Sequence, residues 1–436
     1  MAKFIIDGDK ELEGEIEVQG AKNEALQVIA ATLLTEDEII IENVPEILDV
    51  LNLHKILSDL GVEIKKLGEG IFSYRAKKIN LDYLKTPSFI LRAQKLRGSI
   101  LIVGPLLARF GYALFIKPGG DKIGRRHLDV HIEGLKALGA KLDYDLLKNL
   151  FLLRCEKLKG NYILLSEPSV TGTANVIMAS VLAEGTTTIF NAACEPYIQQ
   201  LCKMLNNMGA KIKGIGSNLL TIEGVSKLHG TRHKILPDFI EVGSFIGLAA
   251  ITKSNLVIKN VCYENLGIIP KAFQKLGIPV SKVNEDDIHI PPLESYEIST
   301  FLDGSILTLY DAPWPGISPD LLPILLVTAI QAKGTVLIHQ KMFESRLFFV
   351  DRLIDMGAQI ILCDPHRAVI IGFDRKQKLQ GIEMRTPDIR AGIAMLIAAL
   401  SAEGVSVIHN VEQIERGYYK IDERLKKIGA KIIKRK

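Results

Sequence analysis

One hydrophobic pattern recurs along the chain: an apolar residue, a glycine, a small or apolar residue and then an alternating, strand-like run. The copies read LGVEI, LGAKL, MGAKI, LGIPV, MGAQI and IGAKI. Successive glycines of these copies lie 78, 70, 68, 80 and 72 residues apart. A period of this kind is typical of internal repeats. The chain is therefore predicted to consist of six diverged units, whose glycines are Gly61, Gly139, Gly209, Gly277, Gly357 and Gly429.

Each of these glycines is predicted to end a helix. Before Gly209, apolar side chains recur at helical spacing after Pro196, a residue that suits a first helical turn. A glycine that follows a helix readily takes the left-handed conformation that terminates it. Ahead of each such helix lies a β-rich stretch, for example 187–190 or 405–409, which another helix precedes. The predicted unit is helix, strand, helix, strands, which makes the fold class α/β.

Composition narrows the class of protein. With 436 residues, 47% hydrophobic and 24% charged, the chain is expected to form two or three globular domains. A net charge of +4 is nearly balanced and argues against nucleic acid as a partner, and the basic cluster at 431–436 is interpreted as a solvated terminus. Apolar runs fall short of the roughly 18 residues that cross a bilayer, and the start of the chain lacks a secretory signal. Neither membrane insertion nor secretion is expected, which leaves the cytoplasm.

Metal and disulfide chemistry are not indicated. The five cysteines are odd in number and form no CxxC pair, so they are predicted to be core thiols. His127 and His131 have the spacing of a helical zinc pair but lack the glutamate of an HExxH motif. This pair is interpreted as a coincidence, and no metal site is predicted.

Polar residues, five of them charged, mark the predicted starts of the first helices of the six units. Capping by Asp238 or Asp388 and a functional role are equally compatible with their position, because aspartate is a good N-cap. Capping does not explain the cations near these starts, because a positive charge opposes the helix dipole there. Cations and exposed backbone N–H groups together favour anion binding. The six positions, 37 to 42 residues before each glycine, are Lys22, Arg97, Thr171, Asp238, Asp320 and Asp388.

Three further arginines occupy comparable points of their units. Arg126 and Arg416 lie 13 residues before their glycines, and Arg346 lies 11 before its own. A single surface arginine is usually a solvated charge, but the repeated offset favours a shared binding role. Asp121 belongs to the segment 117–126, KPGGDKIGRR, whose glycines suit a closing lid as well as a long β-turn.

Several of these motifs together resemble the family of UDP-N-acetylglucosamine enolpyruvyl transferases. They occur in the order of that family and cover nearly the whole chain. The related shikimate 3-phosphate enzymes share the six-unit plan, but their usual Lys-Ser opening is replaced here by Lys22 and Asn23. The motifs are Gly20-Ala-Lys-Asn23, Leu96-Arg-Gly-Ser99, the Pro-Gly-Gly loop, Leu236-Pro-Asp238, Phe343-Glu-Ser-Arg346, Asp388-Ile-Arg390 and Arg416-Gly-Tyr418.

The resemblance implies a two-domain, inside-out α/β barrel with three units in each domain. The first domain would span 21–234 and carry the Pro-Gly-Gly loop, and the second would combine 1–20 with 235–436, with the active site in the cleft between them. Such enzymes transfer the enolpyruvyl group of phosphoenolpyruvate to the 3-hydroxyl of UDP-N-acetylglucosamine and release phosphate, without metal or organic cofactor. The alternatives are shikimate 3-phosphate enolpyruvyl transfer and a catalytically silent nucleotide-sugar sensor.

The resemblance also assigns roles to individual residues. Lys22, Asp121, Asp320 and Arg390 would be catalytic, with Asp320 accepting the proton of the sugar hydroxyl. Phosphoenolpyruvate would bind to cations, which its phosphate and carboxylate require. The remaining residues would hold the nucleotide sugar. The phosphoenolpyruvate set is Lys22, Arg126, Arg346, Arg390 and Arg416, and the sugar-nucleotide set is Asn23, Arg97, Arg126, His127, Asp129, Ser169, Val170, Thr171, Gly172, Asp320 and Met342.

Asp121 departs from the pattern of the family, most of whose members carry cysteine there. A free carboxyl has a pKa of about 3.9 and a thiol about 8.5. Asp121 would therefore donate a proton near neutral pH only where burial or incoming anions raise its pKa. The antibiotic fosfomycin alkylates the cysteine of this family, and a carboxylate is a far poorer nucleophile. The sequence thus predicts fosfomycin resistance.

Overall fold

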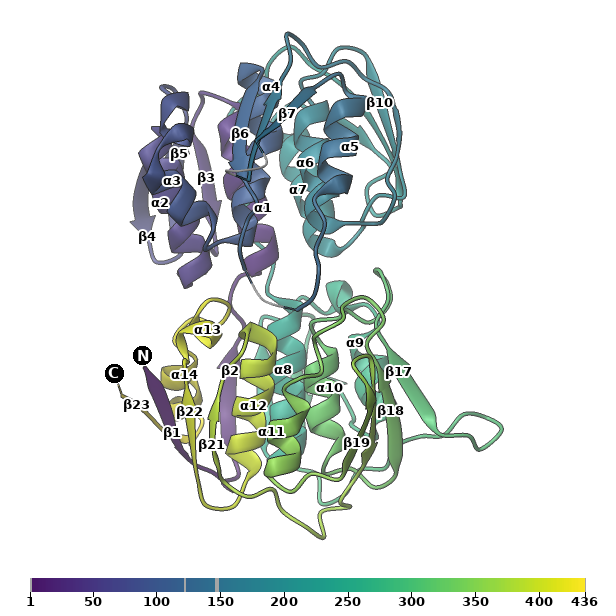
Figure 1. Ribbon diagram of the computed structural model, residues 1–436. Helices are drawn as coiled ribbons and strands as arrows, with labels where there is room; N and C mark the ends of the chain where they lie inside the picture. Colours follow the sequence, from purple (N-terminus) through teal and green to yellow (C-terminus); the bar gives the residue numbers. More distant parts are fainter. Residues whose placement is uncertain (1, 121–122, 146–148, 436) are drawn as a thin grey trace. The chain divides into compact units, whose positions relative to one another are not determined.

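The chain folds into two compact units, described here from a computed structural model that covers residues 2–120, 123–145 and 149–435 (Figure 1). The N-terminal unit comprises Gly20–Gly120 and Arg126–Leu236. The C-terminal unit comprises Met1–Gln19, Asp121–Arg125 and Pro237–Lys436. The chain thus leaves the C-terminal unit after its first strands and returns to it at Asp121–Arg125 and again after residue 236.

The N-terminal unit contains three sheets within the described residues. Each contains antiparallel neighbouring strands, and β10 and β12 alternate between buried and more exposed side chains, as expected for a sheet that covers a core on one face. The strand orders are β13(Arg232–Lys234)-β3(Ile39–Glu42)-β5(Ile71–Arg75)-β4(Glu63–Gly68), β6(Tyr112–Ile116)-β8(Leu150–Arg154)-β7(Lys141–Asp145) and β11(Lys211–Lys213)-β12(Leu219–Glu223)-β10(Thr186–Phe190)-β9(Tyr162–Leu164).

The C-terminal unit repeats this plan in the part of the chain that the structure describes. It also contains three sheets, and one of them is completed by the first strand of the chain. The strand orders are β15(Ser281–Lys282)-β16(Ile288–Ile290)-β14(Asn255–Lys259)-β2(Glu13–Glu17), β17(Leu307–Tyr310)-β18(Thr335–His339)-β20(Arg367–Ile371)-β19(Ile360–Asp364) and β21(Glu383–Arg385)-β22(Val405–His409)-β1(Lys3–Asp7)-β23(Lys431–Arg435).

Strands are exchanged between the units near two of the points where the chain passes from one unit to the other, at residues 19–20 and 236–237. β2 precedes the first helix of the N-terminal unit along the chain, but it pairs in parallel with β14 of the C-terminal unit. β13 precedes the first helix of the C-terminal unit, but it pairs in parallel with β3 of the N-terminal unit. β1 pairs antiparallel with both β22 and β23 and so completes the last sheet.

One helix of each repeat is buried inside its unit and a second covers the outside. In the C-terminal unit every residue of α8, α10 and α12 is buried, because these helices are apolar on all sides and pack against one another. The inner helices are α1(Lys22–Ala31), α4(Val103–Phe110), α6(Val170–Ser180), α8(Phe239–Ile251), α10(Leu322–Ala329) and α12(Ile389–Ser401).

The predicted helix ends are confirmed. The six repeat glycines all have positive φ, between 85° and 109°, and each follows an outer helix. The left-handed conformation releases the chain into the following strand. The outer helices are α2(Leu48–Leu60), α5(Asp129–Ala137), α7(Pro196–Asn207), α9(Ile269–Lys275), α11(Val350–Asp355) and α14(Ile421–Lys427), and the remaining helical segments are α3(Pro87–Ala93), α13(Glu412–Glu415), η1(Thr32–Leu34), η2(Leu81–Lys85), η3(Arg97–Ile102) and η4(Tyr263–Leu266).

The cysteines only partly match the prediction of core thiols. Cys202 is buried, but Cys363 is exposed and Cys155, Cys194 and Cys262 are half-buried. The prediction is wrong for Cys363 because it lies on an outward position of β19, an edge strand. None of the described helices combines the length and the apolar character that a membrane crossing requires.

Candidate active site

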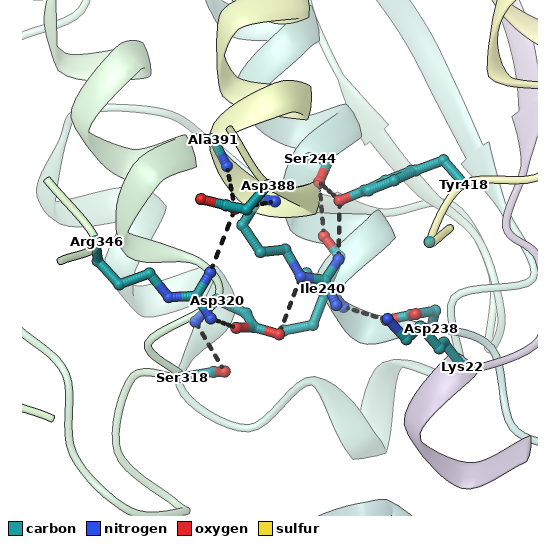
Figure 2. A network of polar contacts seen from close by, with 12 residues as sticks. Lys22, Asp238, Ile240, Ser244, Ser318, Asp320, Arg346, Asp388, Ala391 and Tyr418 are labelled. Atoms are coloured by element: carbon teal, nitrogen blue, oxygen red, sulfur yellow. Dashed lines mark hydrogen bonds and ion pairs between the residues drawn. The ribbon is translucent and has the colours of Figure 1, made fainter. Parts of the chain in front are cut away.

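Asp320 of the C-terminal unit contacts two arginines, Arg346 and Arg390, and Figure 2 shows its carboxylate beside the side chain of Arg346. Oδ1 of Asp320 accepts a hydrogen bond from Nη2 of Arg346, and Oδ2 accepts one from Nε of Arg390 at 2.9 Å. Both arginine side chains are almost inaccessible, with exposed fractions of 5% and 4%, whereas that of Asp320 is 19%. Two buried guanidinium groups therefore share one partly accessible carboxylate.

A buried phenol supports Arg390 from the other side. Nη1 of Arg390 donates to the hydroxyl of Tyr418 at 3.2 Å, which also lies 2.8 Å from Oγ of Ser244. Burial acts to lower the pKa of Arg390, but the negative charge of Asp320 outweighs it, and the pKa is raised above its ordinary value. Burial raises the pKa of Tyr418 to about 12. Arg390 is thus a fixed cation held by a carboxylate and a neutral phenol.

Three of the predicted aspartates follow a proline, in Pro237-Asp238, Pro319-Asp320 and Pro387-Asp388, but their carboxylates differ in function. Asp238 caps α8 by accepting the backbone N–H of Ile240 at 2.9 Å. Asp388 caps α12 by accepting the N–H groups of Arg390 and Ala391 at 2.8 and 3.0 Å. Asp320 does not cap, because α10 begins at Leu322 and its N-cap is the residue between them. The carboxylate of Asp320 is therefore directed to the arginines instead of the helix backbone.

Arg346 has spare hydrogen-bonding capacity. Its Nε and Nη1 atoms are buried and make no hydrogen bond with any described residue. Nη1 lies 3.7 Å from Oδ1 of Asp388, within ion-pair range but beyond hydrogen-bond range. Buried donors without acceptors cost free energy. An incoming anion would therefore find two N–H donors already positioned.

The segment that leads to Arg346 is held by a buried aspartate. Asp311, at the end of β17, accepts the backbone N–H groups of Lys341 and Met342 and a hydrogen bond from the side chain of Gln340. Burial raises the pKa of Asp311 in spite of these hydrogen bonds. Met342, a predicted sugar-site residue, has an exposed fraction of 41%. Sequence reasoning missed Asp311, since an aspartate after a strand usually indicates a turn.

Arg416 lies in the same unit, at the end of α13. Its Nη1 donates to Oε1 of Gln413 at 2.8 Å. The next residues, Gly417 and Tyr418, connect it to the phenol that supports Arg390. The C-terminal unit thus brings Asp320, Arg346 and Arg390 into contact and links Arg416 to them through one turn of chain.

In the N-terminal unit, Lys22 begins α1 and is nearly buried. Its ammonium group lies 2.8 Å from Oδ2 of Asp49 on α2. Asn23 follows on the same helix and is half-buried. Asp49 was missed by sequence reasoning, because an acidic residue in the first turn of a helix is ordinarily explained by the helix dipole.

Arg97 is a cation in an unfavourable environment. It begins the short helix η3 and donates to the backbone carbonyls of Arg126 and His127, both at 3.4 Å. Burial lowers the pKa of Arg97 to about 10, and the positive charge of Arg126 acts in the same direction. The predicted residues Arg97, Arg126 and His127 are therefore together, and their charge is suited to an anionic ligand.

The start of α6 contains the other predicted sugar-site residues. Ser169 is its N-cap and accepts the N–H of Gly172 at 3.3 Å, and Val170 is the first helical residue. Oγ1 of Thr171 lies 3.1 Å from Nε2 of His131. Nδ1 of His131 lies 2.9 Å from Nδ2 of Asn175.

The two histidines that resembled a zinc pair have different environments. Burial, aided by the charge of Arg97, lowers the pKa of His131 to about 3, so this ring is neutral. His127 precedes α5 and is exposed, 3.6 Å from the exposed carboxylate of Asp129. They do not share a helix, and among the described residues no group of three or more His, Cys, Asp and Glu side chains is arranged to hold a metal ion.

Asp121 lies outside the described residues. The segment after it groups with the C-terminal unit. The backbone N–H of Ser345 donates to the carbonyl of Ile123 at 3.1 Å, and the N–H of Arg125 to the side chain of Glu344 at 3.3 Å. This part of the Pro-Gly-Gly loop therefore contacts the residues that immediately precede Arg346.

The fold is that of an enolpyruvyl transferase. The crystal structure of the enolpyruvyl transferase NikO from Streptomyces tendae has the same fold, with a TM-score of 0.85 at 21% identity, covering 100% of this chain and 99% of that chain. The family model of EPSP synthase (3-phosphoshikimate 1-carboxyvinyltransferase) matches residues 6–425. The chain therefore belongs to the EPSP synthase family.

Relatives within this family are similar along their whole length. A UDP-N-acetylglucosamine 1-carboxyvinyltransferase from Porphyromonas gingivalis is 62% identical over 432 residues, 99% of each chain. The protein of the same name from Bacteroides thetaiotaomicron is 61% identical over 432 residues, also 99% of each chain. The resemblance found from the motifs is confirmed.

Proposed function

We propose that this protein transfers the enolpyruvyl group of phosphoenolpyruvate to the 3-hydroxyl of UDP-N-acetylglucosamine, with release of phosphate. The observation that carries the proposal is the carboxylate of Asp320 held between Arg346 and Arg390. Relatives more than 60% identical over the whole chain carry the name of this activity. We further propose that the reaction is the first committed step of peptidoglycan precursor synthesis and takes place in the cytoplasm.

The addition step requires a base and an acid. The sugar oxygen forms a bond to C2 of phosphoenolpyruvate while Asp320 takes the hydroxyl proton. C3 receives a proton from an acid, a role that we assign to Asp121. In the elimination step C3 returns a proton to the deprotonated Asp121 and the C2–O bond to phosphate breaks. Inorganic phosphate leaves, Asp320 releases the proton that it took from the sugar hydroxyl, and the enolpyruvyl ether remains.

Cations position the phosphoenolpyruvate. We assign its carboxylate to Arg346, whose Nε and Nη1 have no acceptor within the described residues, and to Arg390. We assign its phosphate to Lys22, Arg126 and Arg416. Each charge-assisted hydrogen bond of this kind supplies about 1.5 to 3 kcal/mol. When the substrate carboxylate shares the two arginines, their hold on Asp320 weakens, which favours proton transfer to it.

The nucleotide sugar would bind in the N-terminal unit. Its diphosphate would relieve the repulsion between Arg97 and Arg126. The start of α6 adds backbone N–H groups, which bind anions at helix N-termini. The remaining predicted contacts in this unit are Asn23, His127, Asp129, Ser169, Val170, Thr171 and Gly172, and the predicted set also includes Asp320 and Met342 of the C-terminal unit.

Phosphate release from phosphoenolpyruvate with UDP-N-acetylglucosamine tests the proposal. Lys22→Ala and Asp320→Ala should each abolish it, and Lys211→Ala is the matched control, since Lys211 is an exposed residue paired with Glu223. Release with shikimate 3-phosphate as acceptor, and none with the nucleotide sugar, would favour the shikimate activity that the family model names. Binding of the nucleotide sugar without release would indicate a sensor.

Asp121 is tested separately. If it is the acid, donation should slow as pH rises, and Asp121→Asn should lose that pH dependence; a pH–rate profile identical to that of the parent would refute the role. Fosfomycin should not inactivate the protein, whereas Asp121→Cys should become sensitive because a thiolate is a far better nucleophile. Time-dependent inactivation of the parent, with an adduct at residue 121, would overturn the proposed resistance.

A further inference from the structure

Gln19 is the last residue of the first chain segment that belongs to the C-terminal unit. Its backbone N–H, its backbone carbonyl and both ends of its side-chain amide form hydrogen bonds. Its backbone N–H donates to Oε2 of Glu241 at 2.8 Å, and its carbonyl accepts the N–H of Asp238 at 2.8 Å. Its side-chain Nε2 donates to the carbonyl of Gly417 at 2.7 Å. Its Oε1 accepts the N–H of Tyr419 at 2.7 Å. The side-chain amide thus pairs with the 417–419 turn (Gly417 to Tyr419) as a neighbouring strand would.

This pairing allows only one side-chain chemistry. Gly417 presents an acceptor and Tyr419 a donor, and an amide supplies the complementary donor and acceptor. The turn is also confined from the other side, because a Cβ atom at Gly417 would lie 2.6 Å from Cγ2 of Ile389. Gln19 and the start of α12 therefore fix the turn between them.

The 417–419 turn connects two groups of the proposed site. Arg416 precedes it directly. Tyr418, at its centre, is fully buried and its hydroxyl accepts from Arg390 at 3.2 Å. Arg390 in turn donates to Asp320 at 2.9 Å. A displacement of the turn would move the cation assigned to the phosphate and loosen the support of the cation assigned to the carboxylate.

Charged groups surround Gln19 on the elements packed against it. Glu241 on α8 forms a two-point ion pair with Arg424 on α14, at 2.7 and 3.0 Å. Arg424 also donates to the backbone carbonyl of Glu17 on β2. Asp238 caps α8 next to the backbone of Gln19. Glu241 and Asp238 bind the backbone of Gln19, whereas its side-chain amide binds the 417–419 turn.

We propose that Gln19 is a positioning residue for enolpyruvyl transfer, and this inference rests on the proposed function. Its amide sets the 417–419 turn and thereby Arg416 and Tyr418. The residue touches neither substrate in this scheme and acts through the turn. Its loss should consequently weaken the binding of phosphoenolpyruvate more than that of the nucleotide sugar.

Two variants and one control test the inference. Gln19→Met keeps the length of the side chain but removes both hydrogen bonds. Gln19→Glu keeps the oxygen that accepts from the N–H of Tyr419. It replaces the N–H donor to Gly417 by a second carboxylate oxygen, which the carbonyl of Gly417 repels. Gln359→Glu places the same charge on an exposed position of the same unit and should behave like the parent.

Kinetics give the first measurement. At pH 8 both Gln19 variants should raise the KM for phosphoenolpyruvate by roughly 10- to 100-fold, the loss expected for one or two hydrogen bonds to a charged site. The KM for UDP-N-acetylglucosamine should change less than threefold. At pH 5.5 the carboxyl introduced by Gln19→Glu is partly protonated and donates to Gly417, so its activity relative to the parent should rise. Gln19→Met should show no such recovery.

Hydrogen–deuterium exchange gives a measurement that does not depend on turnover. The Tyr419 amide should exchange at least tenfold faster in Gln19→Met than in the parent. An unchanged Tyr419 amide together with an unchanged KM for phosphoenolpyruvate would overturn the inference, as would an equal loss for both substrates accompanied by a general loss of stability. Failure of the proposed function would show instead as absence of phosphate release by the parent, while the exchange experiment would still decide the role of Gln19 in the turn.

Discussion

Arg390 in the C-terminal unit is buried and Arg97 in the N-terminal unit is half-buried, and their charges are compensated differently. Arg390 contacts the carboxylate of Asp320, and its pKa is raised. Arg97 contacts backbone carbonyls at 3.4 Å beside a second cation, Arg126, and its pKa falls to about 10. Burial disfavours the charged form of both arginines. The pKa of Arg390 is nevertheless raised, because the carboxylate of Asp320 is in contact with it.

The comparison shows two kinds of anion site in one protein, one with its own counter-charge and one in which two arginines lie close together. The C-terminal cluster has its own counter-charge, so its arginines are in place before a substrate arrives. In the N-terminal unit the charge of Arg126 acts to lower the pKa of Arg97 and that of Glu167 acts to raise it, and an anionic ligand would further stabilise the charge of Arg97. We expect this unit to gain stability on binding the nucleotide sugar, since a ligand that binds the folded state alone stabilises it.

The largest expected effect follows from removing the shared carboxylate. Asp320→Asn retains the size of the side chain but withdraws the base and the counter-charge of two arginines. The rate of phosphate release should fall by roughly 10² to 10⁴-fold, the usual contribution of a general base. Asp355→Asn, at an exposed residue paired with Arg352, is the control. A loss of less than tenfold would show that Asp320 serves only to hold the arginines.

Substituting the two arginines in parallel tests the comparison directly. Arg390→Met should lower the free energy of unfolding by about 3 kcal/mol, because it removes one partner of a buried ion pair. Arg97→Met should leave that free energy unchanged or raise it, because the cost of burying this charge beside Arg126 is fully present at neutral pH. Denaturant unfolding without ligand measures both.

Ligand binding provides the second half of this test. Arg97→Met should weaken binding of UDP-N-acetylglucosamine by roughly 10- to 100-fold, the loss expected for one hydrogen bond to a charged group. Titration calorimetry measures this affinity. If both variants lost the same stability, or if Arg97→Met bound the nucleotide sugar as tightly as the parent, the contrast between the units would be refuted.

A smaller effect is expected at Glu24 of the N-terminal unit. Its buried carboxyl lies 2.8 Å from Nε2 of His233 and accepts the N–H of Leu236. Burial raises the pKa of Glu24, although the hydrogen bond with His233 opposes the shift. Between the ordinary and the raised pKa the folded state binds a proton that the unfolded state has released, so this group's contribution to stability falls as pH rises through that window.

Glu24→Gln should remove this pH dependence. Its melting temperature relative to the parent should rise as the pH is raised from 4.5 to 8, because only the parent loses the contribution of the protonated carboxyl. Calorimetric scans over that pH range measure it. A difference between variant and parent that stays constant with pH would exclude Glu24 as the titrating group.

The repeated features were predictable because they depend on local chemistry. The left-handed conformation of glycine explains the six helix ends, alternation of apolar residues explains the strand at 405–409, and capping preference explains Asp238 and Asp388. Each of these causes involves only a few neighbouring residues. The comparable positions of the cations also followed from the repeat. Their assignment to particular groups of the substrates came from the family resemblance and stays a prediction.

The partners of these residues required the tertiary structure. Asp320 sits in the same kind of Pro-Asp pair as Asp388, yet one carboxylate meets two arginines and the other caps a helix. Asp49, Asp311 and Gln19 gave no signal, since each acts on residues that are distant in sequence. Local preferences are set by neighbours along the chain, whereas buried charges and amides are satisfied by whatever side chain or backbone packing brings within about 3 Å.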